Sequence, residues 1–256
     1  MAQQFSRRTF SLALMLAWED VRQAYRRSAI GPFWITASMV IQITAMGLVF
    51  GIIFKTPLHD YLPYLASSII LWTIIATSVT DGCMSFISGE AMIKQLNISL
   101  FVHSFRVVFR NLITLAHNFV IIPLVFLAMW HPIGWQVILF VPGILIVLLN
   151  LSWMTVILGM ISARFRDVPQ IVSSMLTIVY FVTPIMWQPS LVPPAAGHWL
   201  LGLNPFYHLL QVMRLPFLSV APTLENWTLS IALAAVGWAG TMLAFRKFGN
   251  QIAYWV

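Results

Sequence analysis

The acidic side chains of this 256-residue sequence are the first candidates for chemistry, and there are only seven of them. Only Asp81 lies near a long apolar segment, so no two carboxylates are placed for general acid/base catalysis. The single cysteine, Cys83, cannot form an intrachain disulfide and is interpreted as a small packing residue. The acidic residues are Glu19, Asp20, Asp60, Asp81, Glu90, Asp167 and Glu225.

Motifs for hydrolysis, metal binding and nucleotide binding are missing from the sequence. It contains no HExxH, no GxSxG and no DxD, and no Cys/His spacing resembles a metal site. No glycine is followed by lysine, which excludes a Walker-type phosphate loop. We therefore expect a protein that is not an enzyme, has no catalytic residue, metal or cofactor of its own, and takes its energy from a partner.

The composition indicates an integral membrane protein. Hydrophobic residues make up 60% of the chain, the mean hydropathy is +0.87, and 11 Trp, 6 Tyr and 18 Phe residues add more apolar surface than a soluble fold of this length could bury. The net charge of +7 requires no nucleic-acid partner, because basic loops facing anionic lipid account for it.

Six apolar runs are each close to the ~20 residues that a helix needs to cross the hydrocarbon. They are continuous rather than alternating, which argues against a β-barrel. We expect an all-α membrane protein with six transmembrane helices. The runs cover residues 33–54, 62–80, 112–129, 135–160, 168–187 and 227–245.

The basic residues orient these six helices. With a cytoplasmic N-terminus, 12 of the 14 basic residues fall in cytoplasmic segments, and only Lys55 and Arg214 fall outside. The positive-inside rule therefore places both termini in the cytoplasm. The twelve are Arg7, Arg8, Arg22, Arg26, Arg27, Lys94, Arg106, Arg110, Arg164, Arg166, Arg246 and Lys247.

Residues 10–28 precede the first run and have the pattern of an amphipathic helix in the headgroup layer. Apolar residues recur every three or four positions, and charged or polar ones fill the other side. SRRTF at 6–10 also resembles a twin-arginine export signal, but its apolar stretch is short and has no small-residue cleavage site. The apolar positions are Phe10, Leu14, Trp18, Val21 and Tyr25; the polar ones are Glu19, Arg22, Gln23, Arg26 and Arg27.

Three connections have distinctive compositions. Residues 88–111 are too long and too charged for a tight turn, and we expect a cytoplasmic helix that continues into the third span. Residues 188–226 contain six prolines and predict short re-entrant or interfacial helices, such as 206–214, on the outside. Between the fourth and fifth spans, Arg164 and Arg166 predict a cytoplasmic hairpin, in which Asp167 would cap the next helix together with Gln170.

Several residues within the runs have possible special roles. Gly47 and Gly51 are one turn apart and could let another helix approach closely. His117 is the one histidine well inside a span and is expected to hydrogen-bond to a neighbouring helix. A kink at Pro184, next to Trp187, could shape a gate. Most aromatic rings are expected in the interfacial belt or in packing, although aromatic surfaces also suit sugars.

Several blocks of sequence, in order from about Tyr25 to the last residue, resemble the permease subunit of bacterial type-2 ABC exporters for O-antigen and capsular polysaccharides. They are RRSAIGPFW (26–34), IKQ (93–95), RNLITLAHN (110–118), ARFRDVPQI (163–171), TPIMWQP (183–189), NPFYHLLQVMRLPFL (204–218) and IAYWV (252–256).

This resemblance implies a homodimer of one permease domain, residues 1–256, with 1–29 as the cytoplasmic interface helix and 30–256 as the six-span bundle. Two copies of a separate ABC ATPase subunit, which bind ATP and Mg²⁺, would drive export of a lipid-linked polysaccharide across the bacterial inner membrane. The same architecture could instead export teichoic acid, drug or lipid. A remoter alternative is an ion-coupled carrier, and a membrane enzyme would need acid/base groups that the sequence lacks.

The resemblance also implies roles for individual residues. Those contacting the ATPase subunit would be Trp18, Glu19, Arg22, Arg26, Arg27, Glu90, Lys94 and Gln95. Those forming a periplasmic gate would be Pro184, Asn204, Pro205, Phe206, Tyr207, His208 and Arg214. A hypothetical path for the glycan passes Trp34, Tyr180, Phe181 and Trp187. The sequence departs from the family pattern at two places that bear on the local geometry of the gate. Gln211 stands where relatives often carry Glu, and residues 97–101 lack the proline that is common after IKQ.

Overall fold

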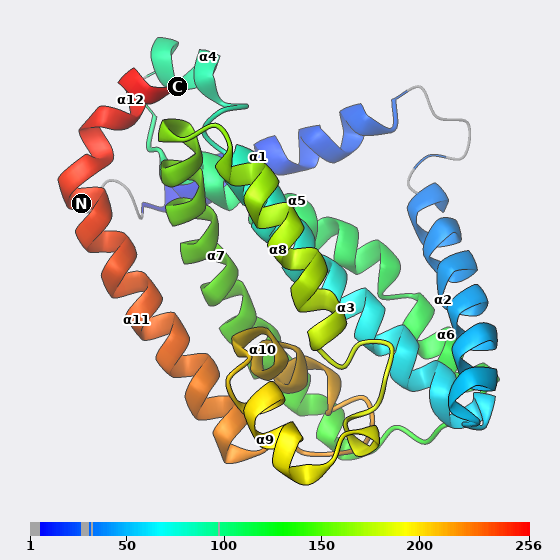
Figure 1. Ribbon diagram of the computed structural model, residues 1–256. Helices are drawn as coiled ribbons and strands as arrows, with labels where there is room; N and C mark the ends of the chain where they lie inside the picture. Colours follow the sequence, from blue (N-terminus) through cyan, green and yellow to red (C-terminus); the bar gives the residue numbers. More distant parts are fainter. Residues whose placement is uncertain (1–5, 27–30, 32, 97) are drawn as a thin grey trace.

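The computed structural model describes residues 6–26, 31, 33–96 and 98–256, apart from the side chains at 194–196 and 198, and this part of the chain is helical without any strand (Figure 1). Five helical segments are long and apolar enough to cross a membrane. They are α2 (Phe33–Phe54); α3 (Leu58–Met84); α5 (Phe101–Asn118) with α6 (Ile121–Ala128); η1 (Trp135–Leu139) with α7 (Phe140–Arg164); and α11 (Leu224–Phe248) with η3 (Gly249–Gln251) and α12 (Ile252–Trp255).

The fifth predicted span is shorter than the sequence indicated. Helix α8 covers Val168–Val182, which at about 1.5 Å per residue is roughly 22 Å of helix. Thr183 has extended backbone angles (φ −78°, ψ 134°), because the ring of Pro184 disfavours a helical conformation in the preceding residue. The prediction of helix over 183–187 was therefore wrong: Pro184 ends α8 rather than kinking it.

Helix α3 is the centre of the bundle. It packs against α2, α5, α6, α7, α8 and α10, and 78% of its most apolar stretch is buried. The corresponding share is only 22% for both α2 and α11, which lie at the periphery. The side chain of Cys83 is fully buried in α3, as its interpretation as a packing residue required.

The two glycines of α2 form its contact with α3. A Cβ atom on Gly47 would lie 2.3 Å from the Cδ2 atom of Leu62, and one on Gly51 would lie 3.1 Å from Leu58. The predicted close helix approach is confirmed, since any larger residue at position 47 would collide with α3.

The segment from Ser88 to Asn111 is not one helix continuing into the third span. Helix α4 covers only Glu90–Gln95, and Leu96 is extended (φ −118°, ψ 133°) before α5 begins at Phe101. Phe101 is fully buried in a second apolar cluster with Phe86 and Ala13. Burial of this ring stabilises α5 at its first residue.

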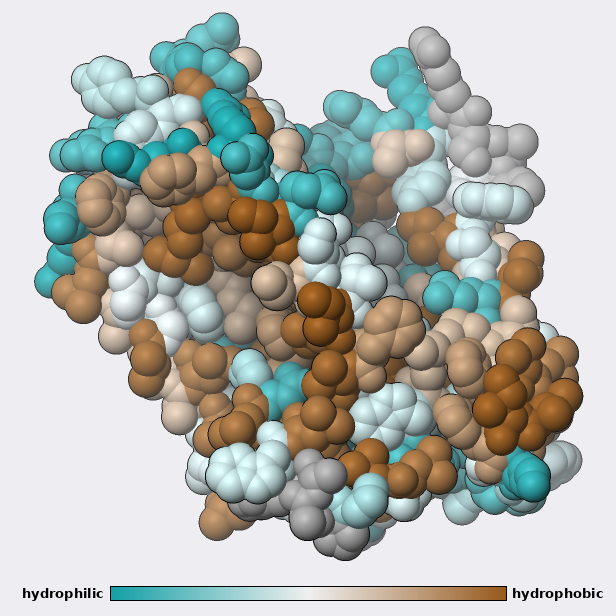
Figure 2. Space-filling model, in the orientation of Figure 1, coloured by the Kyte–Doolittle hydropathy of each residue, from teal (hydrophilic) through white to brown (hydrophobic). Residues whose placement is uncertain are grey.

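The molecule has two distinct ends (Figure 1). Helices α1 (Arg7–Ala24), α4 and α12 lie at one end, which we call the α4 end, and α9 (Pro194–Gly202) and α10 (Pro205–Arg214) lie at the other, the α10 end. A short 3-10 helix, η2 (Pro189–Leu191), precedes α9. Figure 2 shows hydrophilic residues gathered at the α4 end above a broad hydrophobic surface.

Candidate coupling and gate regions

Helix α1 packs on α5 through small residues. Thr9, Ala13 and Ala17 recur at four-residue spacing and are buried, and the ring of Phe10 stacks on Phe105 with centroids 4.9 Å apart. The side chain of Trp18 is 55% exposed. Much of the apolar stripe predicted for this helix is also exposed. The predicted amphipathic helix is confirmed from Phe10 to Ala24, but the sequence interpretation missed that its small-residue face contacts the protein.

An ion-pair network fastens α1 to the bundle. Arg106 of α5 donates two hydrogen bonds to the Asp20 carboxylate, one of them from Nε to Oδ2 at 2.7 Å. Arg110, one turn further along α5, lies 2.9 Å from Asp81 of α3 and 3.7 Å from Asp20. Two arginines and two carboxylates thus join three helices at the α4 end, and we call them the Asp20 network.

The residues expected to contact an ATPase subunit divide into two groups. On α1, Glu19 and Arg22 form an exposed ion pair of 3.1 Å, and Arg26 is exposed just beyond the helix. Arg27 and Ser28, the end of the predicted helix, lie outside the described residues. Because α1 packs mainly on α5 while α4 packs on α12, the two groups do not form one cluster.

Helix α4 is the most exposed helix of the α4 end. Lys94 Nζ donates to Glu90 Oε1 at 2.6 Å, both side chains are about half exposed, and no residue of α4 is buried. This hydrogen bond, together with the charge of Lys94, holds the pKa of Glu90 below its ordinary value. Gln95 is exposed beside them.

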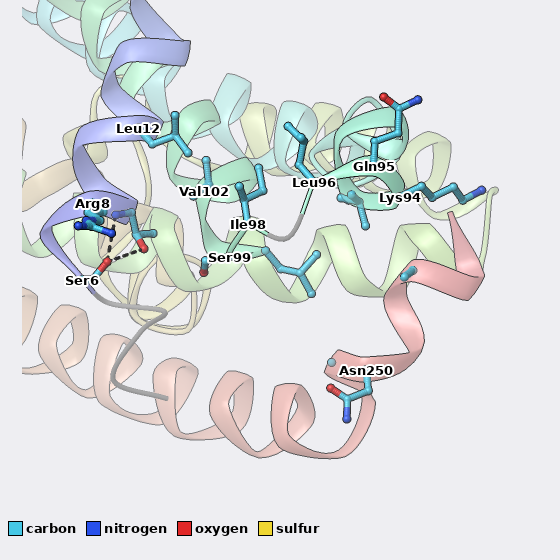
Figure 3. A pocket seen from close by; sticks show the side chains of 15 residues that line it. Ser6, Arg8, Leu12, Lys94, Gln95, Leu96, Ile98, Ser99, Val102 and Asn250 are labelled. Atoms are coloured by element: carbon cyan, nitrogen blue, oxygen red, sulfur yellow. Dashed lines mark hydrogen bonds between the residues drawn. The ribbon is translucent and has the colours of Figure 1, made fainter.

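A groove of about 1090 Å³ lies next to α4. Figure 3 shows Lys94 and Gln95 on one side, Arg8 and Leu12 of α1 on another, and Asn250 on the C-terminal segment. The groove therefore opens between α1, the α4–α5 connection and the chain around Asn250. Its size and its mixed lining suit a protein segment better than a small molecule.

The hairpin between α7 and α8 corrects the capping-box prediction. Asp167 occupies the N-cap position of α8, but its side chain makes no capping hydrogen bond. Its backbone is helical (φ −84°, ψ −17°), whereas a capping side chain requires extended angles. Arg164 instead lies over the Trp255 ring at 5.1 Å, and Arg166 donates to the Trp255 carbonyl at 3.2 Å, so both arginines contact the C-terminal segment.

Arg214 is the centre of the α10 end. Its side chain is 1% exposed and forms no ion pair with any described carboxylate. Its Nη1 atom lies within 2.6–2.9 Å of three oxygens, those of Tyr64, Ser68 and Pro184, and Nη2 donates to Gln211 at 2.8 Å. The guanidinium also lies 4.5 Å from the centre of the Tyr64 ring. Neutral oxygens and one aromatic face therefore stabilise a buried cation.

The same residues hold the non-helical segment 183–187. The Tyr64 hydroxyl lies 2.7 Å from the Pro184 carbonyl and 2.8 Å from that of Trp187. Asn204 donates to the Thr183 hydroxyl at 2.8 Å, while its own oxygen caps the start of α10. Helices α3 and α10 thus clamp the end of α8, and we call Tyr64, Ser68, Asn204, Gln211 and Arg214 the Arg214 cluster.

The remaining predicted gate residues surround this cluster. Pro205 is in the first turn of α10, and Phe206 packs edge-on against Trp72 with ring centroids 6.0 Å apart. The ring nitrogens of His208 lie 2.8 Å from Asn226 of α11 and 3.0 Å from the Gly202 carbonyl, and its ring contacts that of Tyr207. The structure therefore brings together the predicted gate residues of α10 and Pro184.

The four aromatic residues of the hypothetical path do not form one site. Trp34 is 58% exposed at the start of α2, near the α4 end, and Phe181 is 59% exposed on α8. Tyr180 contacts the ring of Trp72 at 6.0 Å, and Trp187 donates to the Phe181 carbonyl at 3.0 Å. Trp34 lies on α2, whereas the other three residues lie on α8 or just after it. Helix α3 separates α2 from α8.

His117 corrects another expectation. Its Nδ1 atom lies 2.8 Å from the carbonyl of Ile113, one turn earlier in the same helix, and the hydrogen bond to a neighbouring helix is made instead by its backbone carbonyl, which accepts from Thr36 Oγ1 of α2 at 3.5 Å. No group of three His, Cys, Asp or Glu in the described ranges could hold a metal ion.

Several residues of both regions were missed from the sequence, although signals for them existed. Tyr64 and Ser68 are one turn apart in an otherwise apolar run, which marks a polar stripe on α3. Arg106 and Arg110 are likewise one turn apart and share one face of their helix. If that face packs against another element, the two arginines require acidic partners there. Their partner Asp20 gave no separate signal.

These features define a multi-pass α-helical membrane protein with one helix, α1, packed across one end. The family model described as ABC-2 type transporter matches residues 12–218, and the chain belongs to this family. A curated relative, the O-antigen export system permease protein RfbA of Myxococcus xanthus, is 24% identical over 78% of this chain and 77% of its own. Two proteins of the same name from Klebsiella pneumoniae are 22% and 23% identical, over 80% and 96% of this chain and 79% and 93% of theirs.

Proposed function

We propose that this chain is the transmembrane subunit of an ABC exporter that moves a lipid-linked polysaccharide of the O-antigen or capsule type across the bacterial inner membrane. ATP hydrolysis on a separate subunit drives the movement. The observation that carries the proposal is the similarity to O-antigen export permeases along nearly the whole chain, up to 96% of it. The sequence, which has no Gly-Lys pair, fits a permease that depends on a partner for nucleotide hydrolysis.

The proposed topology has six crossings and forms a single domain, residues 1–256. Helix α8 and the non-helical residues 183–187 together make the fifth crossing, since about 22 Å of helix needs only a short addition to span ~30 Å of hydrocarbon. Helices α9 and α10 enter from the periplasm and return to it. The α4 end, with both termini, is cytoplasmic, which is supported by the basic residues of α1, α4 and the α7–α8 hairpin.

Two copies of the chain and two copies of the ATPase subunit form the proposed complex. The ATPase subunits bind ATP and Mg²⁺ and dock on the α4 end, where exposed α4 and the neighbouring groove give them a protruding element and a cavity. Trp18, Glu19 and Arg22 of α1, with Arg26 just beyond the helix, add charged and aromatic contacts at the same end. This chain is not itself an enzyme.

Movement of α4 reaches the outer side through α3 in the proposed mechanism. Helix α4 directly follows α3, and the Asp20 network fixes α3 to α5 and α1. At its other end α3 carries Tyr64, which holds residues 183–187. A tilt of α3 would therefore displace the end of α8 and open the gate formed by Pro184 and the α10 residues from Asn204 to Arg214.

The glycan would pass along aromatic rings of α2, of α8 and of the segment after α8, namely the exposed Trp34 and Phe181 and the half-buried Tyr180 and Trp187. A moving polymer requires many weak contacts rather than one tight site, and sugar rings lie well on aromatic faces. The dimer interface would bring the corresponding faces of two copies together around the path.

Deleting the gene in a strain that makes the glycan tests the proposed function. We expect the polysaccharide to accumulate on the cytoplasmic side and to disappear from the surface, and the tagged chain to co-purify with an ABC ATPase. Restoration by the wild-type gene, but not by the Glu90→Gln, Lys94→Gln double variant, would support the role of α4. Normal surface glycan in the deletion strain would contradict the proposal, and loss of a teichoic acid or lipid instead would reassign the cargo.

A further inference from the structure

A second cavity lies between α7 and α11 at the α4 end, away from both the Asp20 network and the Arg214 cluster. Its volume is about 450 Å³, within the ~300–1,000 Å³ typical of small-molecule sites. Arg164 is the one charged side chain among its described lining residues. The apolar part of the lining consists of Ile157, Met160, Ile161, Phe165, Ala244, Phe248 and Trp255.

Two cations lie over aromatic rings of the lining, and one of them, Arg164, itself lines the cavity. The guanidinium of Arg164 lies 5.1 Å from the Trp255 ring and 5.5 Å from the Phe165 ring, and the ammonium of Lys247 lies 5.2 Å from the Phe248 ring. Neither cation forms an ion pair with a described carboxylate.

The depth of the cavity relative to a membrane follows from α7. Arg164 is the last residue of a 30-residue span and therefore lies at the level of the lipid headgroups. Ile157 is seven residues earlier, about 10 Å deeper in the hydrocarbon at ~1.5 Å per residue. A ligand that fills this cavity needs an anionic group at one level and an apolar chain about 10 Å below it.

We propose that the cavity, which we call the α7–α11 pocket, binds an anionic phospholipid, with its phosphate on Arg164 and an acyl chain against Ile157, Met160 and Ala244. Stacking on Trp255 leaves the edge of the Arg164 guanidinium available for phosphate oxygens. Basic pockets between membrane helices are suited to anionic headgroups. The inference requires only that the chain lies in a membrane, so it does not depend on the proposed cargo.

Native mass spectrometry of the full-length protein in detergent, titrated with phosphatidylglycerol or phosphatidylcholine, tests the proposal. The wild type should bind phosphatidylglycerol about five-fold more tightly than phosphatidylcholine, since the one cation in the lining, Arg164, lies near the headgroups and contributes roughly 1 kcal/mol. Arg164→Gln should abolish this preference, and Arg164→Lys should retain part of it. Lys55→Gln, which removes an exposed cation at the other end, should leave it unchanged.

A second variant separates lipid binding from simple anion binding. Ala244→Leu fills the apolar part and keeps every charge, so it should weaken binding of both phospholipids. Equal phosphatidylglycerol affinity in wild type, Arg164→Gln and Ala244→Leu would overturn the proposal. If inorganic phosphate displaced phosphatidylglycerol, or a polyprenyl phosphate bound more tightly than it, the site would not be one for a phospholipid.

Discussion

The two ends of the bundle hold their arginines in opposite ways. At the α4 end, Arg106 and Arg110 are partly exposed and face the carboxylates of Asp20 and Asp81. At the α10 end, Arg214 is buried and is held by neutral oxygens and by the ring of Tyr64. The first arrangement depends on charge pairs that salt and protonation weaken, and the second depends on the exact position of backbone and hydroxyl oxygens.

This difference fits different mechanical roles. Ion pairs at a partly exposed surface can separate and reform at modest cost, which suits helices that must move against each other. A buried cation without a counter-ion is stable only while all its oxygen partners stay in place, which suits a closed gate that opens in one cooperative step. Each of the following four changes tests one side of this comparison.

Arg214→Ala should have the largest effect on stability. It leaves the Gln211 side chain, and part of the hydrogen bonding of Ser68 and Pro184, without a donor in a buried site, at a cost of about 3 kcal/mol. The midpoint of thermal unfolding in detergent should fall by roughly 6–12 °C. Arg214→Lys should recover little of this loss, because a single ammonium cannot reach all the partners. A midpoint equal to that of Lys55→Ala would contradict the importance of the cluster.

Asp20→Asn should have the second largest effect. It removes the charge that receives two hydrogen bonds from Arg106 and should cost about 1–2 kcal/mol of unfolding free energy. A double-mutant cycle with Arg106→Gln should give a coupling energy of similar size that shrinks at high salt, unlike any effect at Arg214. Coupling below about 0.3 kcal/mol would show that α1 is held by packing alone.

Gln211→Glu should stabilise the α10 end. It would also make the two ends more alike, because Arg214 would then face a carboxylate as Arg106 and Arg110 do. Its carboxylate would replace the amide oxygen 2.8 Å from Arg214 Nη2 and give the buried cation a counter-ion. Because charge-assisted hydrogen bonds are roughly twice as strong as neutral ones, we expect a gain of about 1 kcal/mol. Gln211→Leu is the matched control and should destabilise; a glutamate variant less stable than wild type would mean that desolvation of the carboxylate dominates.

Glu90→Gln should have the smallest effect on stability. The pKa of Glu90 is lowered by Lys94, so its contribution is complete above the ordinary value of 4.5 and is lost as the pH falls through the lowered value. Any difference in unfolding midpoint from wild type should be present at pH 7 and vanish in acid. An effect at pH 7 as large as that of Asp20→Asn would place α4 within the stabilising network rather than outside it.

The sequence predicted the spans well wherever hydropathy alone decides them. The first run agrees with α2 at both ends, while α3 and α7 continue past the predicted limits into Asp81 and Arg164. These helices extend beyond the hydrocarbon, so polar residues at their ends do not stop them. The end of α8 was mispredicted, because an apolar run through Pro184 has the same hydropathy in a helix as in an extended chain.

The candidate regions were predicted only in part. Arg214 and Asn204 were identified through family resemblance and Pro184 through its place in an apolar run, and the structure places the three together. Their partners Tyr64 and Ser68 depend on which side of α3 faces α10, and Asp20 depends on the register of α1 against α5. Such contacts join residues far apart in the chain, and the periodicity of a single helix does not determine them.

Reconstitution into liposomes tests the central claim most directly, which is that this chain forms a passage and takes its energy from an ATPase bound at the α4 end. In inside-out proteoliposomes the cytoplasmic face of the protein points to the outer solution. Lipid-linked glycan added to that solution should reach the interior only when this chain, its ATPase partner and ATP are all present. Asp20→Asn should reduce this movement more than it reduces ATPase binding. Sustained uphill movement of glycan by this chain without the partner would contradict the account.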